Sequence, residues 1–320
     1  MDPRYLLRRL GQVPVTVAAI VVMMFVLVHL APGDPILALA GQYGDAAYYA
    51  ELRAKFGLDR PLPVQLVTYL GNVARGDLGT SFTTGRPAAS LVAERLPATM
   101  LLSATALVLS SMVGVAMGTV AGRRPGRPAD VTLRVGAICG YAAPSFWLAQ
   151  LALISLAFGA GAFPVQGMTD ARRSLTGIAN LLDVVHHLAL PALVLAASEV
   201  ALTTRLARTG LIEAGRTEYI RAARAKGLPE RRVTRHALRT ALLPLVTVLG
   251  GRVGMFFAGA VLVEIVFAWP GLGRLLLGSA QTRDYPVLLA IFLVVSLGVV
   301  VVNLVTDLLY GWLDPRIRYR

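Results

Sequence analysis

The segment 216–244, RTEYIRAARAKGLPERRVTRHALRTALLP, is strongly basic and lies between two long apolar runs. Residues 218–226 place apolar side chains on one side and cationic side chains on the other, which is typical of an amphipathic helix. Gly227 can adopt the left-handed conformation that ends a helix, and Pro229 and Glu230 suit the first turn of a new helix. The segment therefore predicts a short helix, a sharp turn at Gly227 and a second helix that bends at Pro244 as it enters the next apolar run.

The rest of the chain places this segment beside a membrane. The 320 residues are 56% hydrophobic and only 15% charged, and the mean hydropathy is +0.64, which is more apolar than ordinary soluble domains. Crossing a bilayer takes about 20 apolar residues. Six blocks reach that length: 11–31, 97–121, 131–158, 187–206, 241–265 and 286–310. We therefore predict an all-α integral membrane protein with six transmembrane helices.

The net charge of +13 fits either a nucleic-acid partner or basic loops on the inner side of a membrane. Six spans favour the second interpretation, because Lys and Arg hold short loops in the cytoplasm. With the N-terminus inside, twenty Lys and Arg residues fall in inner segments and ten in outer ones, most of these in one long loop. We expect a lipid bilayer and no nucleic acid around this chain, both termini in the cytoplasm, and 216–244 as a cytoplasmic loop.

The N-terminus and the first outer loop each have a local pattern. Arginines followed by the apolar run 13–30 are similar to a signal peptide, but the run is longer than usual, which favours a retained helix. The loop 32–96 is too long for a simple connector. It contains two short amphipathic patterns, 49–56, which ends at Gly57, and 62–73. These patterns predict a small extracytoplasmic helical region after the first helix.

Charged residues within the predicted spans are candidates for a translocation pathway. A central charge costs about 2.5–3.5 kcal/mol on insertion scales, so it should face a cavity or a partner. Glu199 is the deepest, and it is a candidate for a pathway wall that meets a cationic amino group. The alternative is a structural hydrogen bond or an ion pair with Arg205 or Arg252. Glu264 lies near the outer end of its span, either on the pathway or simply hydrated.

Two interruptions of the apolar runs are further candidates for the pathway or its gate. Gly140, Ala143 and Pro144 break the third run, and a proline there suits either a wall that lines water or a packing kink. The sequence WPGLG that begins at Trp269 cannot continue a helix and predicts an outer turn near a pore mouth, with Trp269 and Gly271 as candidates. Trp269 is alternatively an anchor at the membrane interface.

The motifs that the chain lacks limit the function classes. There is no GxxxxGK[ST] phosphate loop, no HExxH zinc motif and no GxSxG nucleophile motif. Cys139 is the single cysteine, and the four histidines form no ligand pattern. A transport protein that takes its energy from another chain is therefore favoured. A self-sufficient secondary transporter, for which an inverted repeat is expected, and a membrane enzyme are the alternatives.

The spacing of Arg221-Ala222-Ala223, Gly227 and then Leu243-Pro244 resembles the EAA loop of ATP-binding-cassette importer permeases. Arg221 stands where glutamate is usual, and Leu243-Pro244 lies further on, and both departures are similar to the dipeptide, oligopeptide and nickel branch. Other segments that resemble this branch are LAPGDP from Leu30, LDRPL from Leu58, GDLGTS from Gly76, VEIVFAWPGLG from Val263, DLLY from Asp307 and LDPR from Leu313. The resemblance covers nearly the whole chain, and the long outer region fits the "B" type of permease.

The resemblance implies a type I importer permease fold, with an N-terminal helix and cap over 1–93 and a permease core over 94–314. It implies a location in a bacterial plasma membrane. The implied partners are a second homologous permease, two cytoplasmic ATPases that bind ATP and Mg²⁺, and an extracytoplasmic solute-binding protein. No cofactor is expected on this chain itself. The residues implied to contact the ATPase are Arg221, Ala222, Ala223, Gly227, Leu228 and Pro229. Di- and oligopeptides are the expected cargo, with nickel chelates, glutathione and haem-like molecules as alternatives.

Overall fold

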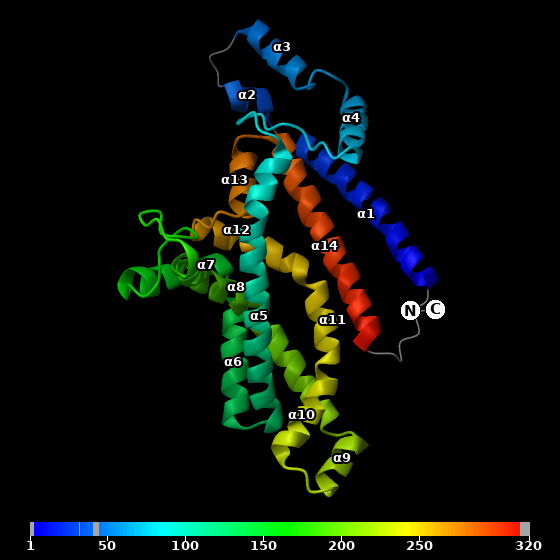
Figure 1. The fold of residues 1–320 in the computed structure, drawn as a ribbon, viewed down its shortest axis with the longest axis vertical. Coiled ribbons are helices and arrows are strands. Elements are labelled where there is room, and N and C mark those ends of the chain that lie inside the picture. The colour runs from blue at the N-terminus through cyan, green and yellow to red at the C-terminus, as the bar shows by residue number, and fades with distance from the viewer. Residues whose placement is uncertain (1–2, 32, 41–44, 314–320) are drawn as a thin grey trace. The chain divides into compact units, whose positions relative to one another are not determined.

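The computed structural model describes residues 3–31, 33–40 and 45–313, and within these ranges the chain folds into helices (Figure 1). Contacts between residues divide the chain into two compact units. The first comprises Met1–Thr99 with Pro270–Val301, and the second comprises Met100–Trp269 with Val302–Arg318, as far as these are described. The division predicted at residue 93 follows the chain, whereas these units combine distant segments, so that division stays a prediction.

Four of the six predicted spans are long apolar helices. They lie in α1 (Pro3–Leu30), α5 (Ala88–Arg123), α8 (Gly177–Ala214) and α14 (Tyr285–Leu313). They correspond to the first, second, fourth and sixth apolar runs, and they confirm those four predictions. The third and fifth runs form broken helices instead.

The third run turns sharply at the predicted break. Helix α6 (Pro128–Ala142) ends before Pro144, and the helical segment that follows, Ser145–Gly159, is inclined to it by 101°. This segment consists of α7 (Ser145–Ala152) and a π-helical end, η1 (Leu153–Gly159). Ala143 is extended because the ring of the following proline excludes the helical conformation. The predicted break is therefore confirmed, and the third run forms a bent pair of helical segments.

The fifth run is also divided. Helix α11 (Leu243–Gly251) and α12 (Val253–Val266) meet at Arg252, which has φ −97° and ψ 0°. Gly250 and Gly251, which are weak helix formers, precede the break. The fifth apolar run is therefore two consecutive helices. Pro244 lies in the first turn of α11, where its missing N–H costs no helical hydrogen bond.

In the first unit, the predicted outer helices are present as α3 (Ala46–Lys55) and α4 (Leu62–Ala74), after a short α2 (Pro35–Ala40). Gly57 follows α3 with φ +68°, a conformation that glycine adopts readily. Tyr69 of α4 stacks on Phe25 of α1 with ring centroids 5.9 Å apart. Burial raises the pKa of Tyr69 to about 12, so its hydroxyl stays protonated in this contact.

A buried carboxylate fastens the end of the outer loop. Asp284 precedes α14 and accepts hydrogen bonds from the Thr83 hydroxyl at 2.8 Å and the Phe82 backbone N–H at 3.0 Å. The Ser81 hydroxyl donates to it as well. The turn between α13 (Leu272–Gln281) and α14 therefore holds the loop that leads into α5.

In the second unit, a stripe of glycines brings α5 close to α8. Gly114, Gly118 and Gly122 recur every four residues, so they lie on one face of α5. A Cβ added at Gly118 would lie 2.6 Å from the carbonyl oxygen of Thr204. Small residues at this spacing allow helix backbones to approach closely. This contact sets the position of the part of α8 that carries Thr204 and Arg208.

Replacing Gly118 with alanine is expected to lower the midpoint of thermal unfolding. The new methyl group would overlap the backbone of α8, which cannot move aside as a flexible side chain could. Overpacking of this kind costs about 1–3 kcal/mol. The matched control is Gly136→Ala, since Gly136 of α6 has open space around it and alanine favours a helix over glycine. A Gly118→Ala protein as stable as the Gly136→Ala protein would contradict the close approach.

Candidate functional site

The basic segment folds as its sequence predicts. Helix α8 ends at Ala214, α9 runs over Glu218–Ala225 and α10 over Glu230–Ala241. Gly227 lies between α9 and α10 with φ +75°, which confirms the left-handed turn. Helix α10 packs back along α8, and α9 lies beyond that contact (Figure 1).

The apolar side of α9 anchors it to its neighbours. Ile220 is fully buried in a cluster formed by α8, α9 and α10, whose other buried members are Leu211, Ala214, Val233 and Ala237. Ala223 and Leu228, two of the predicted contact residues, pack against this cluster. The other four predicted contact residues are exposed: Arg221, Ala222, Gly227 and Pro229. We call this exposed set, which the family resemblance implies to contact an ATPase, the coupling face.

Two of the arginines around the coupling face are paired locally. Arg221 Nη1 lies 2.8 Å from Glu218 Oε1, one turn earlier on α9. Arg224 Nε lies 2.9 Å from Glu230 Oε1 at the start of α10. Both pairs are exposed, so each contributes less than about 1 kcal/mol. The arginine at position 221 therefore adds no unpaired charge to the coupling face, and the Glu218 carboxylate lies beside it.

Glu199, the deepest of the predicted pathway residues, is held by an arginine. Arg252 Nε donates to Glu199 Oε2 at 2.9 Å, and Arg252 Nη2 donates to Oε1 at 2.9 Å. Only 6% of Glu199 is exposed. The ion-pair alternative is therefore confirmed, and it joins the middle of α8 to the junction of α11 and α12. Any role of Glu199 in the pathway stays a prediction.

The other pathway candidates lie at breaks in the helices. Pro144 lies where α6 gives way to α7, and α7 packs against both α8 and α12. Glu264 on α12 is fully buried, so the expectation that it is simply hydrated is wrong. Trp269 is fully buried too, which contradicts an anchor exposed at the membrane interface. Ala268, with φ +50°, and Gly271 form the predicted turn before α13.

Another buried carboxylate, Asp130 at the start of α6, was not predicted. Arg208 donates to both its oxygens, with Nε at 2.7 Å and Nη2 at 2.8 Å. Arg134 Nε lies 3.1 Å from Oδ1, and the Gly126 N–H donates at 2.8 Å. The carboxylate thereby ties the turn between α5 and α6 to α8. The sequence does show an acidic residue in the first turn of a helix within a basic stretch, which favours a structural role for Asp130. It does not show that Arg208 is the partner.

Two family models match the chain. The model described as "Binding-protein-dependent transport system inner membrane component" matches residues 114–319, and its N-terminal companion matches 3–103. The chain belongs to this family. The family resemblance read from the loop at 216–244 is thereby confirmed, and the coupling face lies within the region that the first model matches.

Characterised members of the family align with nearly the whole chain. The oligopeptide transport system permease protein AppB of Bacillus subtilis (strain 168) is 38% identical over 98% of this chain and 99% of its own length. The dipeptide transport system permease protein DppB of Escherichia coli (strain K12) is 38% identical over 99% of both. The probable D,D-dipeptide permease DdpB of the same strain is 40% identical over 94% of this chain and 93% of its own.

A solved structure has the same fold. The inward-facing MetNI methionine ABC transporter matches with a TM-score of 0.56 and 16% identity, over 70% of this chain and 96% of that one. Together with the family models, this match confirms the type I ABC importer permease fold.

Proposed function

We propose that this chain is the "B"-type permease subunit of an ATP-driven importer of di- and oligopeptides in a bacterial plasma membrane. Full-length relatives that are named as dipeptide and oligopeptide permeases carry this proposal. A second homologous permease completes the pore, and an extracytoplasmic solute-binding protein delivers the peptide. On this proposal the chain catalyses no reaction itself.

The coupling face is the proposed contact with the cytoplasmic ATPase subunits, which bind ATP and Mg²⁺. Two observations support this role. The face is exposed, and Ile220 beneath it is fully buried between α8 and α10. A force on α9 therefore passes through packed side chains into α8 and, through α10, into α11. Movement of the ATPases would thereby reach the helices that carry the Glu199–Arg252 pair.

The proposed orientation places both termini and the coupling face in the cytoplasm. The distribution of Lys and Arg supports it, because the segment 205–239 alone contains ten of them. The helical region formed by α2, α3 and α4 then lies outside the cell, on the side from which a binding protein delivers its ligand.

The proposal is tested by purifying the affinity-tagged chain from cells that also express the neighbouring transporter subunits. We expect two ATPase chains and one second permease to purify with it in a stable complex. The control is the Ile220→Asp variant, in which a buried charge detaches α9 from α8 and α10. That variant should lose the ATPases and keep the second permease. Purification of the wild-type chain without ATPases would contradict the proposal.

A further inference from the structure

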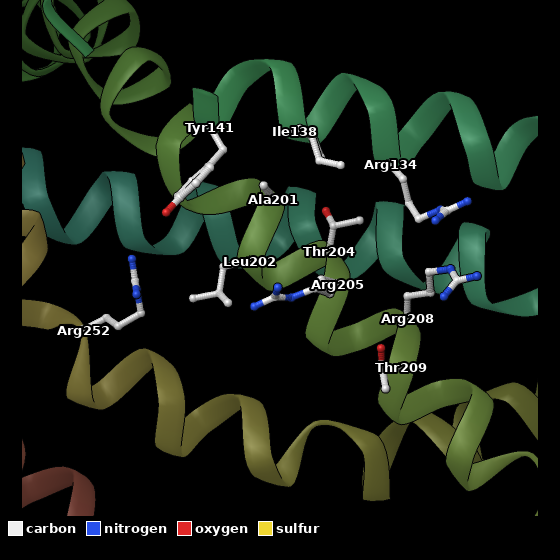
Figure 2. Close-up of a pocket in the computed structure, with 11 residues that line it drawn as sticks. Arg134, Ile138, Tyr141, Ala201, Leu202, Thr204, Arg205, Arg208, Thr209 and Arg252 are labelled. Atoms are coloured by element: carbon white, nitrogen blue, oxygen red, sulfur yellow. The ribbon is translucent and has the colours of Figure 1, made fainter. Parts of the chain in front are cut away.

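A cavity within the second unit is lined by an excess of arginine. Its volume is about 630 Å³, and it lies between α6, α8 and the junction of α11 and α12. Four arginines line it, namely Arg134, Arg205, Arg208 and Arg252 (Figure 2). The volume falls within the range of about 300–1,000 Å³ that is usual for small-molecule sites.

Three of these arginines form ion pairs with nearby carboxylates, and the fourth does not. Arg208 and Arg134 share Asp130, and Arg252 is held by Glu199. Among the described residues, Arg205 has neither a hydrogen-bond nor an ion-pair partner. In Figure 2 its side chain extends from α8 toward the side of the cavity where Arg252 lies. Four guanidinium groups thus lie near two carboxylates, which leaves an excess of two positive charges, and Arg205 is the arginine without a carboxylate partner.

The cavity wall also contains an unused hydroxyl group. Thr204 lines the cavity, its Oγ1 is buried, and no hydrogen-bond partner is present for it among the described residues. A buried polar atom without a partner costs free energy, and an acceptor oxygen of a ligand that reached this hydroxyl group would recover part of that cost. A free guanidinium group beside an unsatisfied hydroxyl group fits a ligand with an anionic oxygen.

We propose that Arg205 binds the C-terminal carboxylate of a peptide as it passes through the permease, an inference that rests on the proposed function. A planar guanidinium group matches a carboxylate with two parallel hydrogen bonds. Every unmodified peptide carries this group whatever its side chains are, so recognition there admits many sequences. Because Arg252 neutralises Glu199, the cavity favours the carboxyl end of a peptide over its amino end.

The experiment uses the purified complex of both permeases and the ATPases. The binding protein is left out, so that any peptide bound is bound by the complex itself. The affinity of trialanine is compared with that of trialanine amide by equilibrium dialysis of radiolabelled peptide. The wild-type complex should bind the free acid at least about tenfold more tightly. Arg205→Gln should remove this preference. Arg205→Lys should keep a smaller preference, because lysine retains the positive charge but cannot donate two parallel hydrogen bonds to a carboxylate.

The matched control is Arg75→Gln, which removes an exposed arginine outside the cavity and should leave the preference unchanged. Equal preference in the Arg205→Gln and wild-type complexes would overturn the inference, as would a wild-type complex that binds neither peptide. Loss of the second permease from the Arg205→Gln complex would overturn it too, in favour of an ion pair between the permeases. Uptake of trialanine by vesicles with the binding protein separates the two proposals. If trialanine is taken up but Arg205→Gln does not change the preference for the free acid, only this inference is overturned. If trialanine is not taken up at all, the proposed function is overturned.

Discussion

Replacing Gly227 with valine is expected to leave the subunit in the membrane and to abolish stimulation of ATP hydrolysis by substrate. Gly227 has φ +75°, a conformation that costs an L-residue about 1–2 kcal/mol and a β-branched residue more. A Cβ at this position would meet nothing within 4 Å. The effect is therefore backbone strain at the turn, which changes the angle between α9 and α10 and leaves the rest of the packing intact.

The control is Gly227→Asn, since asparagine tolerates the left-handed conformation. The asparagine variant should keep most of the stimulation, although it too adds a side chain at this position. Phosphate release by the purified complex, with and without loaded binding protein, measures both variants. Stimulation of the valine variant to the wild-type level would show that the turn geometry does not matter for coupling.

Replacing Glu199 with leucine is expected to be the most destabilising of the single changes. It leaves the Arg252 guanidinium group, which is 26% exposed, without the carboxylate that now accepts two hydrogen bonds from it. Breaking one side of a buried ion pair costs about 3–5 kcal/mol. The midpoint of thermal unfolding of the purified protein should fall accordingly, and Arg252→Met should have a similar effect.

The double variant Glu199→Leu with Arg252→Met separates charge compensation from simple packing. Apolar residues of similar volume often replace a buried ion pair without loss, so the double variant should recover most of the stability that each single variant loses. A double variant that loses the sum of the two single effects would contradict an ion pair as the link between α8 and the α11–α12 junction.

Features set by local sequence were predictable. The turn at Gly227 follows from a glycine after cationic residues and before Leu228-Pro229, and all of that information lies within a few residues. The outer helices α3 and α4 have their own glycine and proline boundaries. The four long helices are visible as apolar runs, because crossing a bilayer requires a minimum length whatever the tertiary contacts are.

Features that depend on distant partners were not predictable. Asp130 and Arg208 are 78 residues apart and Glu199 and Arg252 are 53 apart, so nothing local selects one arginine from several. Hydropathy measures apolar length but not direction. A hydropathy pattern therefore does not show the 101° bend near Pro144. For the same reason it does not separate the two helices that meet at Arg252.

The burial of Glu264 was missed for a similar reason. Its position near the end of an apolar run suggested water, whereas its burial depends on the fold around α12. The glycines at 114, 118 and 122 recur every four residues in the sequence, but this spacing alone was not interpreted. Their meaning required knowledge of the helix that they face.

On the proposed function, this chain carries peptides with energy from separate ATPase subunits. We test this by measuring uptake of a radiolabelled dipeptide into vesicles that contain the complete complex, with binding protein outside and nucleotide inside. We predict uptake with ATP, none with ADP, and none when the ATPase subunits are left out. Uptake by this chain without the ATPases, driven by a proton or sodium gradient, would contradict the account.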